Sequence, residues 1–306
     1  MHTKTQIMKI TLTGSLGHIG KPLTRALVQK GHSITVITSN PEKQMEIEAL
    51  GATAAIGLLA DRDFITSAFA GADAVHCMVV GANYFDHDFD LLAYYQKLGS
   101  NYVQAIKHNG VKNVINLSSI GAHLEKGNGI LRGAYEVERI LNELPADVGI
   151  THIRPTEFYY NLLPQVHSAK SSGILASNIG GDVVNSWVSP LDIAEVVAEK
   201  ITSTVTGRKV RYVASDEITY NELTSVLAQK LNKPELKWVQ LTDEQMQSGM
   251  EAIGMQPKIA AGLTEMYAAI NSGLLYEHYN LNKPRKMGEI KVADFAKEFA
   301  DAYKQL

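Results

Sequence analysis

The sequence contains a single cysteine, Cys77, in 306 residues. One cysteine excludes an internal disulfide and is typical of a protein from a reducing compartment. No apolar run reaches the roughly 18 residues that a membrane-spanning helix needs, and residues Met1–Lys9 are polar rather than signal-like. We therefore expect a cytoplasmic protein that does not enter a membrane.

A strong excess of charge is also missing. The formal net charge is -3, and charged residues make up 20% of the chain. This mild acidity gives no electrostatic reason to expect a nucleic-acid partner, so the partner we expect is a small-molecule substrate. At 306 residues the chain can bury a large core and form one extended domain or two unequal ones.

Short apolar runs alternate with longer amphipathic stretches over the first 155 residues. The runs predict strands at Ile7–Leu12, Ser33–Ile37, Thr53–Ile56, Ala74–Met78, Asn113–Leu117 and Ile150–Ile153. The stretches predict helices at about Ile19–Lys30, Glu42–Leu50, Asp63–Ala70, Asp86–His108 and Gly133–Leu144. Gly31 and Gly110 stand where helix C-caps are expected. This alternation favours an α/β fold with a doubly wound parallel sheet, the Rossmann arrangement.

The pattern changes after Arg154 and Pro155. Helical patterns then dominate, at Asn221–Leu231, Asp243–Ile253, Ile259–Ile270 and Val292–Lys304. Two strand-like pieces interrupt them, at Val183–Val188 and Val210–Val213. We expect residues 1–155 to form the Rossmann domain, with its sheet completed by residues 183–214. Residues 156–306 then form a smaller, mostly helical C-terminal lobe, and substrate binds between this lobe and the carboxyl ends of the strands.

A glycine-rich turn directly follows the first predicted strand and opens the first predicted helix. Gly14 permits a tight turn, Gly17 lets the backbone approach a pyrophosphate, and Gly20 allows close packing of the helix. The helix N-terminus offers unpaired N–H groups to phosphates. This context predicts that NAD(P) contacts the turn at Gly14, Ser15, Leu16, Gly17, His18 and Ile19. The alternative is a glycine-rich turn that binds nothing.

The end of the second predicted strand bears on the choice of dinucleotide. A carboxylate there would bind the adenosine ribose and favour NAD, but Thr38 and Ser39 occupy the positions. Hydroxyl and amide groups, with Lys43 nearby, can accept the 2′-phosphate of NADP. We therefore favour NADP(H), with NAD(H) as the alternative. Ser39, Asn40 and Pro41 also suit a cap for the next helix, and both roles are compatible.

Further segments match one family in order and at plausible spacing. Gly71–Val75 resembles the "GxDxV" segment of the NmrA-like, atypical short-chain dehydrogenase/reductases. Asn116–His123 resembles the family's segment after the fifth strand, and Glu136–Glu138 followed by Ile153–Leu162 its next helix, strand and loop. Val188–Ala194 resembles its "SxxDIA" helix start. The matches extend from residue 7 to about residue 200, and the last hundred residues carry little that matches.

The resemblance implies an NAD(P)-binding protein related to NAD(P)H-dependent quinone or azo-dye reductases. It also implies an alternative, because some members are redox-sensing regulators that bind the dinucleotide without turning it over. The segments that leave the strands are the expected walls of the site. Among them we assign to the cofactor Val79, Val80, Ser118, Pro155 and Phe158.

The Tyr-x-x-x-Lys pair of ordinary short-chain dehydrogenases is missing. Aligned through Glu138, the lysine falls at Ala134 and the tyrosine at Ile130. Tyr135 and Arg139 have the right spacing, but they are out of register, and arginine stays protonated. The sequence therefore argues against ordinary alcohol dehydrogenation. Hydride delivery to a quinone needs no dedicated protein acid, only a positioned nicotinamide and an apolar slot for a flat acceptor.

Three polar residues are candidates for catalysis. Ser119 can hydrogen-bond a substrate carbonyl, His123 can donate a proton or orient the substrate, and Tyr135 can face the cleft from its helix. Their alternatives are structural, namely loop capping for Ser119 and an ordinary hydrogen bond for His123. The residues that we assign to the substrate are Tyr84, Phe85, Tyr159 and Asn161. The aromatic ones can instead pack the interface between the lobes.

Other chemistry finds little support in the sequence. Asp86, His87 and Asp88 are adjacent and cannot converge on one metal ion, so we expect no metal site there. Cys77 lies in an apolar strand, where a buried packing role is favoured over a nucleophile. No Gly-x-Ser-x-Gly elbow is present to indicate an esterase.

Overall fold

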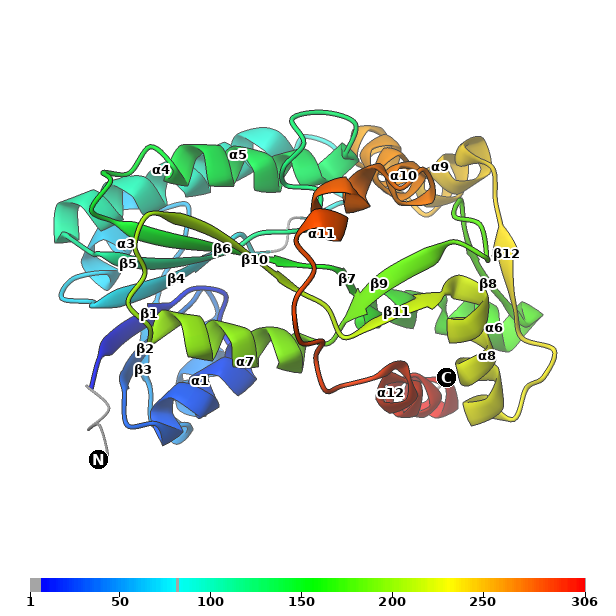
Figure 1. Ribbon diagram of the computed structural model, residues 1–306, viewed down its shortest axis with the longest axis horizontal. Helices are drawn as coiled ribbons and strands as arrows, with labels where there is room; N and C mark the ends of the chain where they lie inside the picture. The colour runs from blue at the N-terminus through cyan, green and yellow to red at the C-terminus, as the bar shows by residue number, and fades with distance from the viewer. Residues whose placement is uncertain (1–6, 81–82, 306) are drawn as a thin grey trace.

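The computed structural model describes residues 7–80 and 83–305. Two lobes lie side by side along the long axis of the molecule (Figure 1). The larger is built on a seven-stranded sheet, and the smaller combines helices with two small sheets. No helix in the described part of the chain is long and apolar enough to cross a bilayer.

The large sheet is parallel throughout, in the order β10-β6-β5-β4-β1-β2-β3. Its strands are β1 (Lys9–Leu12), β2 (Ser33–Thr38), β3 (Thr53–Ile56), β4 (Ala74–Met78), β5 (Asn113–Leu117), β6 (Gly149–Pro155) and β10 (Arg208–Val213). The six strands predicted from the apolar runs are all present, and the predicted fold class is confirmed. The strand order reverses between β1 and β4, which is where doubly wound sheets bind ligands.

Helices cover both faces of this sheet (Figure 1). One face carries α1 (Gly20–Gln29), α2 (Gln44–Ala49) and α7 (Pro190–Ile201), and the other carries α3 (Arg62–Ala68), α4 (Leu91–Asn109) and α5 (Arg132–Leu141). Gly110 ends α4 in the left-handed conformation, as its predicted capping role requires. Helix α4 begins at Leu91, not at Asp86, because the Asp90 carboxylate caps the N–H of Ala93.

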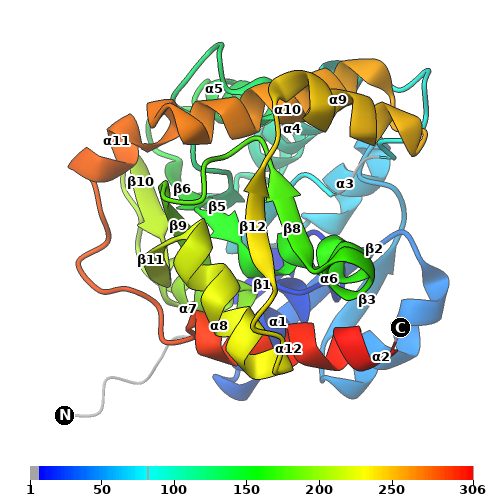
Figure 2. The ribbon, with the colours of Figure 1, turned by 90° about the vertical axis from the view of Figure 1, so that its right-hand side faces the viewer.

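The smaller lobe is mostly helical, as predicted. Its helices are α6 (Val166–Ser172), α8 (Tyr220–Leu231), α9 (Asp243–Ala252), α10 (Pro257–Asn271), α11 (Glu277–Leu281) and α12 (Val292–Gln305). Viewed end-on, α9 and α10 lie on one side of a strand pair and α8 and α12 on the other (Figure 2). A buried cluster of large side chains that includes Trp187, Tyr220 and Phe299 forms its core.

The segment expected to complete the large sheet divides between the two lobes. Strand β10 joins the sheet beside β6, as predicted. Strand β9 (Val184–Val188) does not, because it pairs with β7 (Glu157–Phe158) and with β11 (Asp216–Thr219) in a separate sheet. The remaining two strands, β8 (Ile174–Ser177) and β12 (Lys237–Gln240), pair with each other.

Candidate functional site

The glycine turn is tight, as its sequence predicts. Gly14 has φ +93°, and a side-chain carbon added there would lie 2.1 Å from Sδ of Met78. A side-chain carbon at Gly20 would lie 2.0 Å from the carbonyl oxygen of Ser15. At Gly17, by contrast, the added carbon would meet only the Gly14 carbonyl oxygen, 3.7 Å away. The turn is therefore closed on its inner side and open at Gly17.

The open side of the turn can accept an anion. The N–H groups of His18 and Ile19 precede α1 and donate to no acceptor among the residues that the structure describes. They lie at the positive end of the helix dipole. Free N–H groups beside an open glycine fit the pyrophosphate of a dinucleotide.

The end of β2 continues the site toward the adenosine side. The Ser15 hydroxyl donates to Oγ1 of Thr38 at 2.9 Å, which ties the turn to this strand. Asn40 accepts from the N–H of Glu42, so the capping role weighed from the sequence is real. Ser39 is exposed at the rim.

Lys43 belongs to a small charged cluster at this rim. Its Nζ lies 2.8 Å from one Glu46 oxygen, and Nζ of Lys21 lies 2.8 Å from the other. Hydrogen bonds from Lys21 and Lys43 lower the pKa of Glu46 to about 2. Two cations on one carboxylate leave a net positive charge, which favours a phosphate over a bare ribose hydroxyl.

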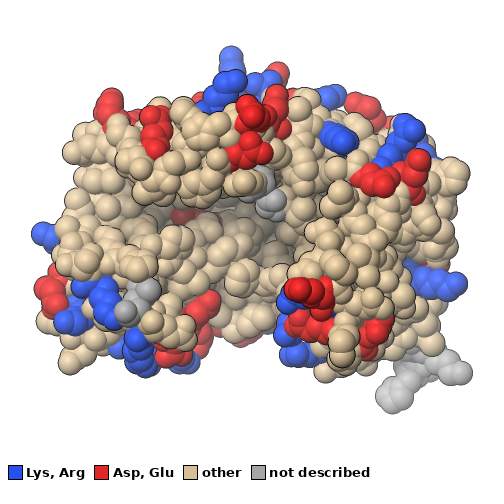
Figure 3. Space-filling view, turned by 180° about the vertical axis from the view of Figure 1, so that it is seen from behind, with Lys and Arg blue, Asp and Glu red and all other residues tan. Residues whose placement is uncertain are grey.

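An aromatic stack crosses from the smaller lobe to the glycine turn. The Phe158 ring stacks on Tyr160 at 5.0 Å, and Tyr160 stacks on His18 at 4.5 Å. Two residues assigned to the cofactor from the sequence, His18 and Phe158, are thus joined through Tyr160. Seen from behind, the molecule is hollowed between its lobes, and few charged side chains are visible in the hollow (Figure 3). Such a cleft suits a flat, uncharged ring.

The loop after β4 forms another wall. Val79, Val80 and Tyr84 are half-buried, whereas Phe85 is 53% exposed. Burial, and then the charge of Tyr84, raise the pKa of Tyr160. Gly81 and Ala82, which fall within the expected wall, lie outside the described residues.

Gln256 holds this loop against the smaller lobe. Its Nε2 donates to the carbonyl oxygens of Asp86, His87 and Phe89 at 2.9 to 3.0 Å. Its backbone N–H donates to the carbonyl oxygen of Tyr84 at 2.9 Å. Gln256 is 5% exposed, so the amide is a buried clamp between the two lobes.

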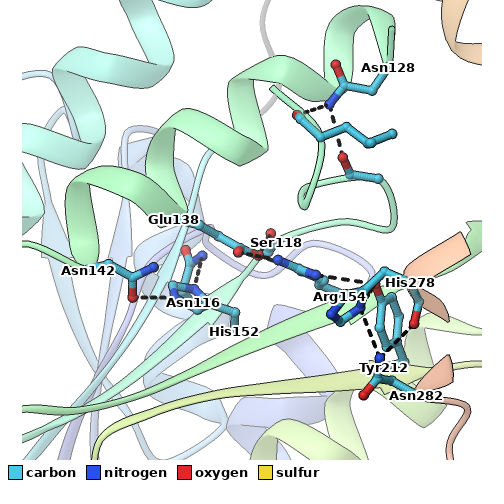
Figure 4. A network of polar contacts seen from close by, with 12 residues as sticks. Asn116, Ser118, Asn128, Glu138, Asn142, His152, Arg154, Tyr212, His278 and Asn282 are labelled. Carbon is cyan, nitrogen blue, oxygen red and sulfur yellow. Dashed lines mark hydrogen bonds and ion pairs between the residues drawn. The ribbon is translucent and has the colours of Figure 1, made fainter. Parts of the chain in front are cut away.

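Beneath the cleft lies a buried ion pair between α5 and β6. Glu138 and Arg154 form two hydrogen bonds, at 2.9 and 2.6 Å, and both side chains are buried (Figure 4). The Ser118 hydroxyl donates to Glu138 at 2.5 Å, and Arg154 donates to the Tyr212 hydroxyl at 3.3 Å. The hydroxyl of Tyr212 in turn lies 2.9 Å from Nδ1 of His278. This network links the loop after β5 to α5, β6, β10 and α11.

The residues assigned to catalysis occupy different surroundings. Neither ring nitrogen of His123 has a partner among the described residues, and the ring lies 5.3 Å from that of His278. Burial and then the charge of Arg154 lower the pKa of His123 to about 4. His123 is therefore neutral at pH 7, which suits orienting a substrate and not supplying a proton. The Ser119 hydroxyl bonds to no described residue, and Tyr135 lies near the exposed Arg139.

The aromatic residues of the segment after β6 lie in different surroundings. Tyr159 is 2% exposed, its ring stacks on Trp187 and Phe295, and its hydroxyl donates to Asp216 at 2.6 Å. It belongs to the core of the smaller lobe and not to the cleft wall, which corrects its assignment to the substrate. Pro155, at the end of β6, accepts the N–H of Ile120 and so anchors the loop after β5. Asn161 lines a small pocket beyond the stack.

The sequence was compared with models of known protein families. The model of the NmrA-like family matches residues 6–297. The chain belongs to the NmrA-like family. The resemblance inferred from the sequence is thereby confirmed.

The relatives of this NmrA-like protein include several reductases. An NAD(P)H azoreductase from Xenophilus azovorans is 24% identical over 260 residues, which cover 85% of this chain and 86% of that protein. An NADPH-dependent quinone oxidoreductase from Escherichia coli has a TM-score of 0.75 at 20% identity, covering 94% and 98% of the two chains. A triphenylmethane reductase from Citrobacter sp., complexed with NADP(H), has a TM-score of 0.76 at 18% identity, covering 95% and 99%. The two structural likenesses show a shared fold.

This NmrA-like chain has apolar surroundings where an ordinary short-chain dehydrogenase has its tyrosine. Ile130 packs against α10, since a side-chain carbon added at Gly262 would lie 2.9 Å from Cγ2 of Ile130. Ala134 occupies the lysine position on α5. The packing of Ile130 and the alanine at the lysine position thus agree with the sequence-based argument against alcohol dehydrogenation.

Reasoning from the sequence assigned no role to three residues that the structure places in or beside the cleft. Tyr160 sits within an aromatic run, where local sequence does not tell which ring faces inward. Gln256 lies in the last hundred residues, where no motif matches. Glu157 lies two residues after the end of β6, in a segment where the sequence predicts a cleft wall and gives no sign of a buried carboxylate.

Proposed function

We propose that this protein is an NADPH-dependent reductase that delivers hydride to a quinone-like or other conjugated small-molecule acceptor. The observation that carries the proposal is the glycine turn facing an aromatic stack, with His18 in contact with Tyr160. One side of the cleft suits a dinucleotide and the other a flat ring. The azo, quinone and dye reductases among its relatives support the same reaction class.

The chain's own residues suit NADP(H). Backbone N–H groups at His18 and Ile19 would bind the pyrophosphate, and Ser39 with Lys43 would bind the 2′-phosphate. The larger lobe would then hold the dinucleotide and the smaller lobe would complete the acceptor side. Structures of the quinone oxidoreductase with NADPH and of the triphenylmethane reductase with NADP(H) support this choice. NAD(H) remains the alternative.

The reaction needs no proton transfer from a protein side chain. Bound NADPH supplies the hydride. Tyr84, Phe158 and Tyr160 exclude water and hold the acceptor parallel to the nicotinamide. The Ser119 hydroxyl can donate a hydrogen bond to an acceptor oxygen. Both ring nitrogens of His123 are buried, so His123 would reach the acceptor only if its ring turned toward the cleft. Solvent protonates the stabilised product oxyanion, so a Tyr/Lys pair is not needed.

The alternative function, a dinucleotide-sensing regulator without turnover, is less favoured. The named relatives above are reductases, and the cleft has an aromatic wall that a dinucleotide sensor does not require. The mild net charge of -3 gives no support to a nucleic-acid partner. The single buried Cys77 supports a reducing compartment, which we take to be the cytoplasm.

Oxidation of NADPH and NADH by the purified protein tests the proposal, with quinones, azo dyes and enones as acceptors. We expect turnover with at least one acceptor, and loss of turnover with retained NADPH binding in Tyr84→Ala. Gly17→Val fills the open side of the turn, so its affinity for NADPH should fall about tenfold or more. Gly249→Val is the matched control, since a side-chain carbon there meets nothing within 4 Å. Tight binding of NADPH without turnover on any acceptor would instead identify a sensor.

A further inference from the structure

A small pocket in the smaller lobe carries an unusual carboxylate. It has about 30 Å³ of open volume, whereas roughly 10–15 Å³ holds one water molecule. It can therefore take one compact substituent of a ligand, but not an aromatic ring. The residues that matter for the argument are Glu157, Asn161, Tyr220, Trp238 and Tyr267.

Only one of the two Glu157 oxygens is occupied. Oε2 accepts from the Tyr220 hydroxyl at 2.8 Å and from Nδ2 of Asn185 at 2.7 Å. Both hydrogen bonds from described residues reach Oε2 and neither reaches Oε1. None of the residues lining the pocket is lysine or arginine. The carboxylate therefore faces the pocket without a compensating positive charge, an arrangement that is costly unless a ligand supplies the charge.

Aromatic rings surround this carboxylate. The ring centroids of Tyr220 and Trp238 are 4.5 Å apart. The indole N–H of Trp238 donates to the carbonyl oxygen of Ile179 at 2.8 Å. Tyr267 forms another part of the wall. The hydroxyl of Tyr220 and the indole N–H of Trp238 are both hydrogen-bonded. The π faces of such rings can still attract a cation.

The pocket and the cleft wall are built from the same chain segment, residues 157–161. Glu157 and Phe158 are consecutive in β7, so their side chains point to opposite faces of that strand. Phe158 and Tyr160 belong to the stack, and Asn161 follows Tyr160 on the pocket wall. Tyr267 lines the pocket, and burial, then the charges of Glu157 and Tyr84, raise its pKa.

We propose that this pocket binds a compact ammonium group on the acceptor, with Glu157 as the residue that selects it. The inference rests on the proposed function, because it names the class of acceptor: a conjugated ring carrying a short aminoalkyl substituent. The ring lies in the aromatic cleft and the ammonium group enters the pocket, where it pairs with Oε1 of Glu157. A neutral acceptor of the same size leaves the carboxylate unpaired.

The preference depends on pH with a definite sign. Burial raises the pKa of Glu157 to about 7, so the carboxylate predominates above pH 7 and the acid below it. The titratable groups that face Glu157 are Tyr220 of α8, Tyr267 of α10 and Tyr276 of the turn before α11. Burial raises the pKa of all three, so they stay neutral from pH 6 to 8. An alkylammonium group, with a pKa of about 10, stays charged over this range.

The test compares one quinone bearing an aminoethyl, an ethyl or a hydroxyethyl side chain. At pH 8 we expect kcat/KM for the aminoethyl quinone to exceed that for the ethyl quinone about tenfold or more. In Glu157→Gln this ratio should fall to near one, while exposed Glu265→Gln of the same wall helix, α10, should retain it. An unchanged ratio in Glu157→Gln would overturn the proposal. So would a hydroxyethyl quinone used as well as the aminoethyl one.

Two further measurements test the inference if Glu157→Gln does not fold or if the protein reduces no acceptor. In the wild type the aminoethyl preference should rise from pH 6 to pH 8, and a preference that is flat with pH contradicts a role for Glu157. If no acceptor is reduced, the proposed function fails but the pocket can still be tested by binding. Quenching of Trp238 fluorescence should then show tighter binding of the aminoethyl quinone than of the ethyl quinone. Equal affinities would overturn the pocket alone.

Discussion

The ring of His18 stacks on the ring of Tyr160, with centroids 4.5 Å apart and planes inclined by 15°. His18 belongs to the glycine turn of the large sheet, and Tyr160 to the segment that leads from β6 into the smaller lobe. The contact therefore joins the dinucleotide side of the cleft to its acceptor side. Phe158 extends the stack behind Tyr160, which makes the aromatic wall two rings deep.

Removing the central ring should impair reduction without abolishing it. Stacked aromatic pairs contribute about 0.5–1.5 kcal/mol beyond area burial, so Tyr160→Ala should lower kcat/KM for a quinone by about three- to tenfold. Tyr160→Phe retains the ring and should behave like the wild type. Steady-state kinetics of both variants check this, with NADPH titration alongside. A loss in Tyr160→Phe as large as that in Tyr160→Ala would point to the hydroxyl and contradict a stacking role.

The choice between NADPH and NADH should depend on Lys43. Because Lys21 also binds Glu46, replacing Lys43 leaves that carboxylate paired and removes the net positive charge. Lys43→Ala removes a charge-assisted contact to the 2′-phosphate, so KM for NADPH should rise about tenfold. KM for NADH should stay nearly unchanged. Exposed Lys97→Ala on α4 is the control. Equal increases for both cofactors would place the 2′-phosphate elsewhere.

The large sheet could be predicted because its signals are local. β3, β4 and β5 begin and end at the residues that their apolar runs indicate. The short strands of the smaller lobe could not be predicted in this way. β7 has two residues and owes its place to pairing of Glu157 with Trp187, a distant partner that no local pattern reveals. For the same reason the sequence places the strand predicted at Val183–Val188 in the large sheet, whereas β9 lies in another sheet.

The candidate site divides along the same line. The glycine turn follows from residues within one strand–turn–helix unit, so Gly14, Gly17 and Gly20 could be given roles from spacing alone. Tyr159 and Tyr160 are neighbours with the same side chain, and only tertiary packing decides which is buried against Trp187. The sequence indicates an aromatic wall there but does not distinguish its members.

Removing one partner of the ion pair beneath the cleft should destabilise the fold more than removing both partners. In Glu138→Gln the Arg154 guanidinium stays buried without its counter-charge, which should destabilise the fold by about 3–5 kcal/mol. The double variant Glu138→Leu with Arg154→Met removes both charges and should be more stable than Glu138→Gln. Urea unfolding of the three proteins measures this. A double variant less stable than Glu138→Gln would mean that the pair contributes more than it costs to bury.

The clamp at Gln256 yields a prediction that separates loop order from cofactor binding. Gln256→Ala leaves three carbonyl groups of the loop between β4 and α4 without their shared donor, at Asp86, His87 and Phe89. The loop that carries Tyr84 should then exchange amide hydrogens faster over residues 83–90. We expect kcat/KM for the acceptor to fall about tenfold, because Tyr84 loses its fixed position, while the Kd for NADPH stays nearly constant. Exposed Gln229→Ala on α8 is the control. Unchanged hydrogen exchange in Gln256→Ala, or an equal loss of NADPH affinity, would show that Gln256 does not position this wall of the cleft.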